Sequence, residues 1–252
     1  MAMNEFEIKK LMCDIGRRVY DRGMVAANDG NFSVKLNDNE FLCTPTGVSK
    51  GFMTPEYICK VDRDGNVIQA NGNFKPSSEI KMHMRVYQER PDVNAVVHAH
   101  PPVATAFTVA DIDLDQYVLP EAVLTIGAVP TCDYGTPSTM EIPDSLDPYI
   151  QNHDAFLLRN HGALTVGCNL TKAFFVMEEV EFNAVICKHA MDLGAVHEIS
   201  NDQLKKLMDL RKAMNLPGRH PGIDYGEEEP KCDCNEKMVE EITRRVLAAL
   251  RK

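Results

Sequence analysis

Short apolar runs separated by turn-forming residues fill most of residues 28–75, and they constrain the fold more than any other feature of the sequence. The runs FSVKL, EFLCT and YICKV alternate with NDGN, TPTG, RDGN and NGN. Gly, Asn, Asp and Pro favour tight turns, and strands joined by tight turns pair antiparallel. The pattern therefore predicts an antiparallel meander in this part of the chain.

Helical periodicity appears on both sides of this meander. Apolar residues at helical spacing predict an amphipathic helix over residues 4–22. A serine able to cap a helix predicts a second helix from about 78 to 90, and a third is predicted over 171–193. The runs NAVVH, AVLTIG, AFLLR and ALTVG predict further strands. Helices interleaved with strands indicate a layered α/β architecture.

Length and composition indicate one domain with an appendage. The chain has 252 residues, 44% of them hydrophobic, so it can bury a substantial core. We expect a catalytic domain over 1–215. Residues 216–234 are rich in Pro, Gly and acidic side chains, which predicts a linker. Residues 235–252 place apolar side chains on one helical stripe, which predicts a separate amphipathic helix.

The acidic charge of the chain limits its partners. The 37 acidic and 27 basic residues give a net charge of −10, which disfavours nucleic acid and anionic membranes as partners. The sequence contains no apolar run of membrane-spanning length, and its charged N-terminal segment is unlike a signal peptide, so we expect a cytoplasmic protein. The eight cysteines lack CxxC spacing and are expected to be reduced, although the CxC pair at Cys232 and Cys234 could have a redox or metal role.

Three histidines form the strongest candidate for a metal site. His98 and His100 are two residues apart in VVHAHPP, so on a strand both imidazoles lie on one face. His161 follows the run AFLLR, where Gly162 permits a turn and Asn160 could support the loop. Three neutral imidazoles with an open fourth position suit a catalytic zinc ion. For the HxH pair alone, a structural or surface role is the alternative, and the other five histidines are interpreted as structural or solvated.

Residues near Glu79 could bind an anion or move a proton. Glu79 lies at the start of the helix predicted after PSSE, where it is either an ordinary helix-terminal acid or a general base. Ser77, Ser78 and the neighbouring N–H groups could bind phosphate. The loops NDGNFS and TPTG could add an anion-binding concavity, or they could simply be turns.

The ordered set GNFS, TPTG, PSSE, VVHAH and NHGAL resembles the class II aldolase/adducin family over roughly residues 5–215. The resemblance implies a three-layer α/β/α fold around a mostly antiparallel central sheet, and a homotetramer with active sites between subunits. It implies a zinc ion on His98, His100 and His161, with Glu79 as the base. It further implies a phosphate pocket formed by Asn31, Thr46, Gly47, Ser77 and Ser78.

Within the family, the motifs are most similar to those of enzymes that cleave a deoxyketose 1-phosphate. The implied substrate is L-fuculose 1-phosphate, and the products are dihydroxyacetone phosphate and a small aldehyde such as L-lactaldehyde. Pentulose-phosphate epimerase, methylthioribulose-phosphate dehydratase and a non-catalytic adducin-like interaction module are the alternatives. One departure concerns the aldehyde: where those aldolases place a tyrosine from a neighbouring subunit, this sequence has Leu119, with Tyr117 two residues away. A second family tyrosine falls near Met214.

The helix predicted at 235–252 has three interpretations. A linker followed by a short amphipathic helix resembles the peptides that direct enzymes into bacterial microcompartments, where the apolar stripe docks on shell or cargo proteins. The helix could instead pack on its own oligomer. It could also lie on a membrane surface, although it mixes Glu with Arg and Lys and is not strongly basic.

Overall fold

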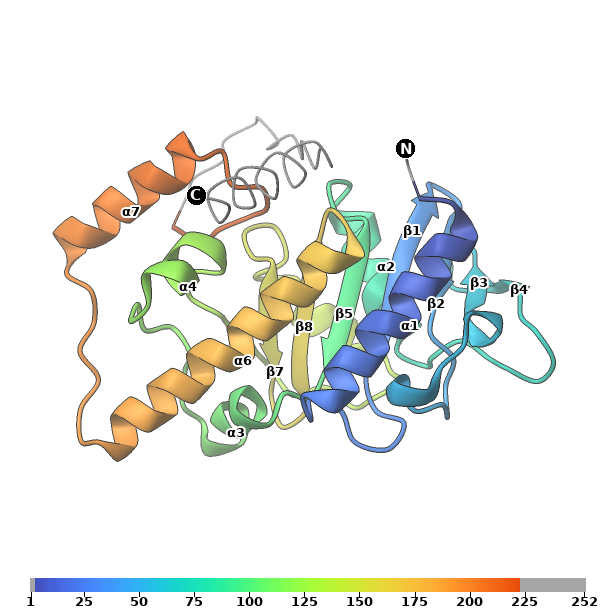
Figure 1. Cartoon of the computed structure of the whole chain (residues 1–252), viewed down its shortest axis with the longest axis horizontal. Helices are drawn as coiled ribbons and strands as arrows, with labels where there is room; N and C mark the ends of the chain where they lie inside the picture. Colours follow the sequence, from blue (N-terminus) through green and yellow to red (C-terminus); the bar gives the residue numbers. More distant parts are fainter. Residues whose placement is uncertain (1–2, 223–252) are drawn as a thin grey trace, which may run out of the picture.

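The structure, a computed structural model, describes residues 3–222, which fold around one eight-stranded sheet (Figure 1). The strand order across the sheet is β4-β3-β2-β1-β5-β8-β7-β6. Neighbouring strands are antiparallel except for β6 and β7, so the sheet is mostly antiparallel, as predicted. The strands are β1 (Asn31–Asn37), β2 (Glu40–Cys43), β3 (Cys59–Val61), β4 (Val67–Gln69), β5 (Ala95–Ala99), β6 (Thr131–Cys132), β7 (Ala155–Leu158) and β8 (Gly162–Gly167).

Helices connect the strands and cover the sheet. The α-helices are α1 (Glu5–Asp21), α2 (Ile80–Glu89), α3 (Pro102–Ala110), α4 (Pro120–Thr125), α5 (Glu141–Ser145), α6 (Leu170–Asp192) and α7 (Asn201–Ala213). Two short 3-10 helices, Lys50–Phe52 and Pro55–Tyr57, follow β2. In Figure 1, α1 and α6 cross the front of the sheet and α2 lies behind it.

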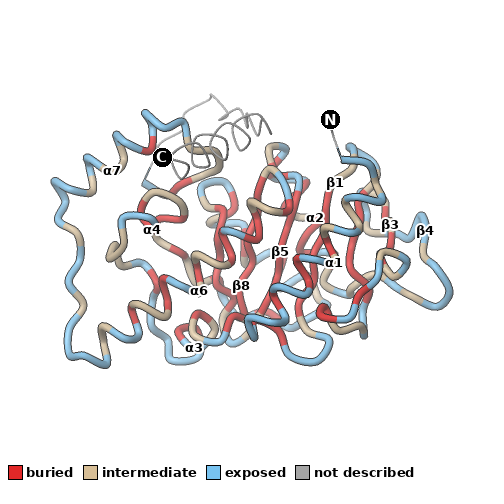
Figure 2. Tube along the Cα trace, viewed as in Figure 1, coloured by how far each residue is buried: buried red, intermediate tan, exposed pale blue. Residues whose placement is uncertain are grey.

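The sheet separates two buried clusters, because successive residues of a strand point to opposite faces. Ala95, Val97 and Ala99 of β5 pack with α1 and α6, on what we call the α1/α6 face. Val96 packs with α2 and α5, on the α2/α5 face. Figure 2 shows this burial as continuous red along the central strands. The predicted three-layer α/β/α fold is therefore confirmed.

Most predicted elements are present, but one predicted strand was wrong. The helices predicted over 4–22, 78–90 and 171–193 correspond to α1, α2 and α6. The run AVLTIG, predicted as a strand, instead falls largely in the helix α4. Pro120 is the first residue of α4, where the fixed φ and missing N–H of proline suit a helix start. A short apolar run does not distinguish a strand from a helix by itself.

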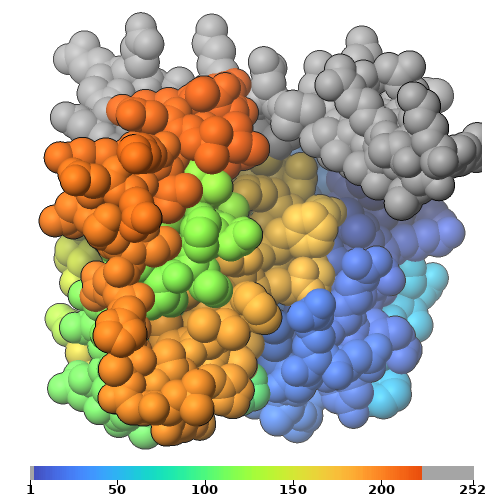
Figure 3. All heavy atoms as spheres, turned by 60° about the vertical axis from the view of Figure 1, so that its left-hand side comes forward, coloured from blue at the N-terminus to red at the C-terminus, as the bar shows by residue number. Residues whose placement is uncertain are grey.

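The described part of the predicted linker, residues 216–222, packs against the domain. It has no helix or strand, as its Pro and Gly content suggests. His220 is fully buried, and its Nε2–H donates to the Val123 oxygen at 2.6 Å, which ties this segment to α4. Figure 3 shows α7 and α4 side by side on this surface, in agreement with their contacts. Packed structure thus continues beyond residue 215, and the predicted helix at 235–252 lies outside the described residues.

Two further predictions concern cysteines and membranes. Free thiols are present at Cys13, Cys43, Cys59, Cys132 and Cys187. The prediction of reduced thiols was wrong for Cys168, which is disulfide-bonded. Such a bond depends on proximity in space, which the spacing of cysteines in sequence does not reveal. None of the helices within residues 3–222 combines the length and apolar character needed to cross a bilayer.

Candidate active site

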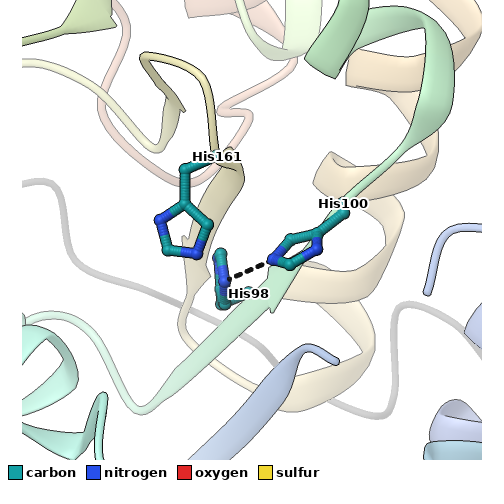
Figure 4. A group of neighbouring side chains, drawn as sticks. All are labelled: His98, His100 and His161. Atoms are coloured by element: carbon teal, nitrogen blue, oxygen red, sulfur yellow. Dashed lines mark hydrogen bonds between the residues drawn. The ribbon is translucent and has the colours of Figure 1, made fainter. Parts of the chain in front are cut away.

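Three histidine side chains converge at one end of β5 (Figure 4). His98 lies on β5, His100 follows this strand, and His161 directly precedes β8, which pairs with β5. The ring centroids of the three pairs are 4.8 to 5.0 Å apart, and one ligand nitrogen from each histidine lies within 4.8 Å of the others. The structure therefore brings together the three histidines singled out by the sequence.

The hydrogen bonds of these histidines leave nitrogens available for a cation. His98 Nδ1 lies 2.9 Å from the Ala163 oxygen, so Nδ1 carries the proton and Nε2 has the lone pair. That Nε2 lies 3.2 Å from Nε2 of His100, whose Nδ1 faces Asp29 at 3.6 Å. Burial, followed by the nearby His161, lowers the pKa of both His98 and His100, that of His98 to well below its usual range. Neutral imidazoles with converging nitrogens fit zinc or another divalent metal that favours nitrogen ligands.

Local backbone conformation explains how the segment before β8 reaches β5. Asn160 has a φ of 55°, a left-handed conformation that asparagine tolerates better than most residues. A Cβ at Gly162 would lie 2.5 Å from the Ala99 oxygen and 2.6 Å from Cδ2 of His100. Gly162 is therefore needed for the close approach of two histidine-bearing segments, and it is Asn160 that provides the unusual backbone conformation.

Glu79 lies at the N-terminal end of α2 and faces the histidines. Its Oε1 lies 3.3 Å from His161 Nε2, and its Oε2 lies 3.4 Å from His98 Nε2. Oε2 accepts a hydrogen bond from Asn31 Nδ2 at 2.6 Å, whereas Oε1 is buried and accepts none. Asn31 thus holds one carboxylate oxygen, and the other, beside His161, accepts no hydrogen bond.

Four buried side chains continue this hydrogen bonding behind Glu79. Asn31 Oδ1 lies 2.6 Å from His83 Nε2. Ser33 Oγ lies 2.7 Å from His83 Nδ1 and 2.8 Å from the Tyr87 hydroxyl. Burial, with a further contribution from the nearby His98, lowers the pKa of His83 to about 3, so its ring is neutral. We call Asn31, His83, Ser33 and Tyr87 the polar chain.

The two predicted phosphate-binding segments lie side by side. An isolated β-bridge joins Pro45 of TPTG to Pro76 of PSSE. Gly47 has a φ of 73°, a left-handed conformation that favours glycine in this turn. The α2 helix begins just beyond PSSE, and its N-terminal end favours an anion. The predicted ligands in these segments are exposed or half-buried, and so accessible: Thr46, Gly47, Ser77 and Ser78.

A sequence profile of the family described as Class II Aldolase and Adducin N-terminal domain matches residues 10–187. The chain belongs to the class II aldolase and adducin family. This confirms the predicted family and the predicted enzyme class, a class II aldolase among the lyases. The histidine cluster agrees with a metal-dependent member of this family.

Relatives of this class II aldolase differ in their named reactions. An L-fuculose phosphate aldolase from Methanococcus maripaludis is 38% identical over 167 residues, covering 66% of this chain and 88% of its own. A 3-oxo-tetronate 4-phosphate decarboxylase from Haemophilus influenzae is 34% identical over 186 residues, covering 72% and 87%. The crystal structure of YgbL from Klebsiella pneumoniae, a candidate aldolase/epimerase/decarboxylase, is 30% identical with a TM-score of 0.76, covering 82% of this chain and 100% of its own.

Within residues 3–222, the structure places the positions that were compared with the two tyrosines of the family: Leu119, with Tyr117 nearby, and Met214. Tyr117 lines a cavity of about 510 Å³ beside α4 and α7, and none of the three histidines lines this cavity. Leu119 is the residue before α4 and packs against the cluster of the α1/α6 face. Met214 follows α7 and is largely exposed. A role for Tyr117 in a neighbouring subunit stays a prediction.

The polar chain was missed by sequence analysis, which interpreted His83 as structural or solvated. Residue spacing contained part of the signal. His83 lies four residues after Glu79, on the same side of the helix start, and Ser33 lies two residues after Asn31, on the same strand face. The pairing between these two elements depends on the fold and could not be read from spacing.

Lys50 was also missed, and no sequence signal identified it. Its side chain is buried, and Nζ donates to the backbone oxygens of Asn28 at 2.9 Å and Val48 at 2.7 Å. Burial lowers the pKa of Lys50 to about 8, although the charges of Asp29 and Glu79 act to raise it. Lys50 therefore joins the loop before β1 to the loop that follows TPTG.

Proposed function

We propose that this chain catalyses the reversible, zinc-dependent aldol cleavage of a deoxyketose 1-phosphate, with L-fuculose 1-phosphate as the best candidate. The products are dihydroxyacetone phosphate and L-lactaldehyde. The observation that carries the proposal is the buried Oε1 of Glu79, which accepts no hydrogen bond and lies 3.3 Å from His161 Nε2. An open carboxylate oxygen beside three converging imidazoles suits a base that moves a proton at carbon. The Methanococcus relative named L-fuculose phosphate aldolase supports this substrate.

The residues of the site have separate parts in this reaction. His98, His100 and His161 would hold the zinc ion, which when bound supplies Lewis-acid polarisation of a substrate carbonyl. In the synthetic direction, Glu79 Oε1 removes a proton from the hydroxymethyl carbon of dihydroxyacetone phosphate. After cleavage, the same oxygen returns a proton to that carbon. The hydrogen bond from Asn31 holds Oε2 and keeps Oε1 directed at the histidines.

The substrate phosphate is assigned to the rim of the site. The exposed or half-buried groups of Thr46, Gly47, Ser77 and Ser78, together with the N-terminal end of α2, supply donors there. Asn31 donates one amide hydrogen to Glu79, and its Nδ2 has a second hydrogen that could reach the phosphate. This pocket suits the phosphate ester that both named reactions of the relatives share.

Decarboxylation is the second candidate, and the Haemophilus relative favours it. In 3-oxo-tetronate 4-phosphate, the carboxylate is bonded to the carbon next to the ketone. Breaking that bond releases carbon dioxide, and protonation of the same carbon then yields dihydroxyacetone phosphate. Both reactions therefore end with Glu79 protonating an equivalent carbon. They differ in that only aldol cleavage releases an aldehyde, for which Leu119 stands in place of the family tyrosine.

Turnover of three compounds separates these reactions. Zinc-loaded wild type and Glu79→Gln would be assayed with L-fuculose 1-phosphate, with 3-oxo-tetronate 4-phosphate, and with dihydroxyacetone phosphate in D2O, where NMR follows deuterium incorporation at the hydroxymethyl carbon. We expect aldol cleavage and deuterium exchange by wild type, and a loss of roughly 10²–10⁴-fold in Glu79→Gln with zinc retained. Glu89→Gln, at the other end of α2, is the matched control.

The pattern of activities decides between the candidates. Carbon dioxide release without cleavage of L-fuculose 1-phosphate would replace the aldolase by the decarboxylase. If folded, zinc-loaded wild type performs none of the three reactions, both the aldolase and the decarboxylase are rejected. The epimerase, the dehydratase and the adducin-like module would then be tested.

Assembly and location are further parts of the proposal. We propose a homotetramer of cytoplasmic subunits, each with its domain at 1–215, in which Tyr117 is offered to a neighbouring site, and residues 235–252 act as a microcompartment-targeting helix. Deleting residues 235–252 should leave turnover unchanged and abolish association with shell or cargo proteins. Dissociation of the oligomer in that variant would instead support packing of this helix within the oligomer, and loss of vesicle binding would support the membrane surface.

A further inference from the structure

The polar chain has a fixed donor order, which can be worked out from its end at Glu79. Asn31 Nδ2 donates to Glu79 Oε2, and the amide oxygen Oδ1, which can only accept, faces His83. His83 Nε2 then carries the ring proton and donates to Oδ1. Because His83 is neutral, its Nδ1 is an acceptor.

The same reasoning fixes the two outer members. The one hydroxyl hydrogen of Ser33 is donated to His83 Nδ1, across 2.7 Å. The Tyr87 hydroxyl must therefore donate to Ser33 Oγ, across 2.8 Å. Every hydrogen bond in the set thus points from Tyr87 towards the carboxylate.

Burial makes this arrangement rigid. The exposed fractions of the four residues are 0% for Ser33, 1% for His83, 4% for Asn31 and 7% for Tyr87. Water has little access to replace a missing partner, and hydrogen bonds in a continuous buried set strengthen one another. Rotation of the Asn31 amide would set its NH2 against the Nε2–H of His83, donor against donor, and its oxygen against the Glu79 carboxylate, so the polar chain opposes that rotation.

We propose that His83 is a positioning residue for catalysis, which orients Glu79 through the Asn31 amide so that Oε2 is held and Oε1 is presented to the substrate. This role rests on the proposed function of Glu79 as the base. His83 has no part in it as a metal ligand or as a group that exchanges a proton with substrate. Ser33 and Tyr87 fix the tautomer of His83, as outer partners do for histidines bound to metals.

The kinetic test compares substitutions along the polar chain. His83→Phe keeps a ring but removes both nitrogens, whereas His83→Gln can still donate to Asn31 and accept from Ser33. Tyr87→Phe removes only the outermost donor. Tyr149→Phe is the matched control, since Tyr149 packs against the same cluster but is not part of the polar chain.

Each zinc-loaded variant would be measured for kcat, KM, melting temperature, zinc content and deuterium exchange into dihydroxyacetone phosphate. We expect His83→Phe to lower kcat and exchange roughly 10–100-fold, with KM and zinc content unchanged. His83→Gln should recover much of this loss, and Tyr87→Phe should show a smaller loss. Wild-type kcat in folded His83→Phe, no recovery in His83→Gln, or losses that follow melting temperature across all variants including Tyr149→Phe would overturn the proposal.

A second measurement does not depend on activity. NMR of protein labelled with ¹⁵N-histidine identifies which ring nitrogen of His83 carries hydrogen. We expect the Nε2–H tautomer in wild type, and a loss of tautomer preference in Ser33→Ala. A His83 found as the Nδ1–H tautomer or as imidazolium contradicts the donor order even if the enzyme is active. Inactive wild type with the expected tautomer would instead reject the proposed reaction, while the donor order of the polar chain would still be supported.

Discussion

The two faces of the central sheet use the same alternation of strand residues for different purposes. On the α1/α6 face, Ala95, Val97 and Ala99 pack in a largely apolar cluster, where the buried Thr165 hydroxyl donates to a backbone oxygen at 2.8 Å. On the α2/α5 face, the same strand carries His98, and β1 carries two members of the polar chain. The comparison separates residues that mainly stabilise the fold from residues that position the chemistry.

The largest expected effect is loss of the metal on the α2/α5 side. His98→Ala leaves two of three histidine ligands, so zinc content should fall well below one ion per chain and turnover should fall below detection. Elemental analysis of purified protein and the turnover assay check this. His197→Ala, which removes an exposed histidine, should keep both. Stoichiometric zinc in His98→Ala would remove this histidine from the proposed ligand set.

The matching substitution on the α1/α6 face should change stability without changing chemistry. Phe174 of α6 is 1% exposed, and Phe174→Ala should lower the free energy of unfolding by about 3–5 kcal/mol. Urea denaturation measures this loss. The kcat per folded, zinc-loaded molecule should equal that of wild type. A large fall in kcat without a fall in stability would break the division between the two faces.

His220 lies away from the three histidines of the site, and it shows how burial changes the pKa of a histidine and the stability that depends on it. Burial, with the nearby Arg211 as a second cause, lowers its pKa from 6.5 to about 4 in the folded chain. Between pH 4 and 6.5, His220 binds a proton in the unfolded chain but not in the folded chain. The contribution of its neutral ring to the free energy of unfolding is therefore fully present above about pH 6.5 and is lost as the pH falls towards 4. The loss is on the order of 3 kcal/mol.

The variant His220→Gln can still donate to the Val123 oxygen but does not titrate. Urea denaturation at several pH values should therefore give a weaker acid dependence in this variant than in wild type. An unchanged dependence would assign the acid sensitivity to other groups, such as His83.

The smallest expected effect is at the phosphate rim. Ser78→Ala removes one exposed hydroxyl from the proposed pocket, so KM for the phosphorylated substrate should rise by roughly tenfold, which is about 1.4 kcal/mol, at similar kcat. Steady-state kinetics at fixed zinc checks this, with the exposed Ser138→Ala as control. A fall in kcat at unchanged KM would instead place Ser78 next to the reacting carbon.

Prediction from sequence succeeded where the information is local. The apolar runs between turn residues predicted the meander, and the two-residue spacing of His98 and His100 predicted that their side chains share a face. The structure confirms both predictions. Prediction from sequence failed at α4, because a short apolar run fits either kind of element. The hydrogen bond between His83 and Asn31 could not be predicted, because it joins residues 52 apart in sequence and helical spacing does not say what a helix packs against.

The pairing of β5 with β8 has a consequence for the chain as it is synthesised. This pairing sets His98 opposite Leu164, and α3, α4, α5, β6 and β7 lie between the two strands in sequence. In a nascent chain that ends before β8, β5 can pair only with β1, and its other edge has no partner, because contacts between distant segments cannot form until both have been made. The three histidines therefore come together only after the segment that carries His161 and β8 has left the ribosome.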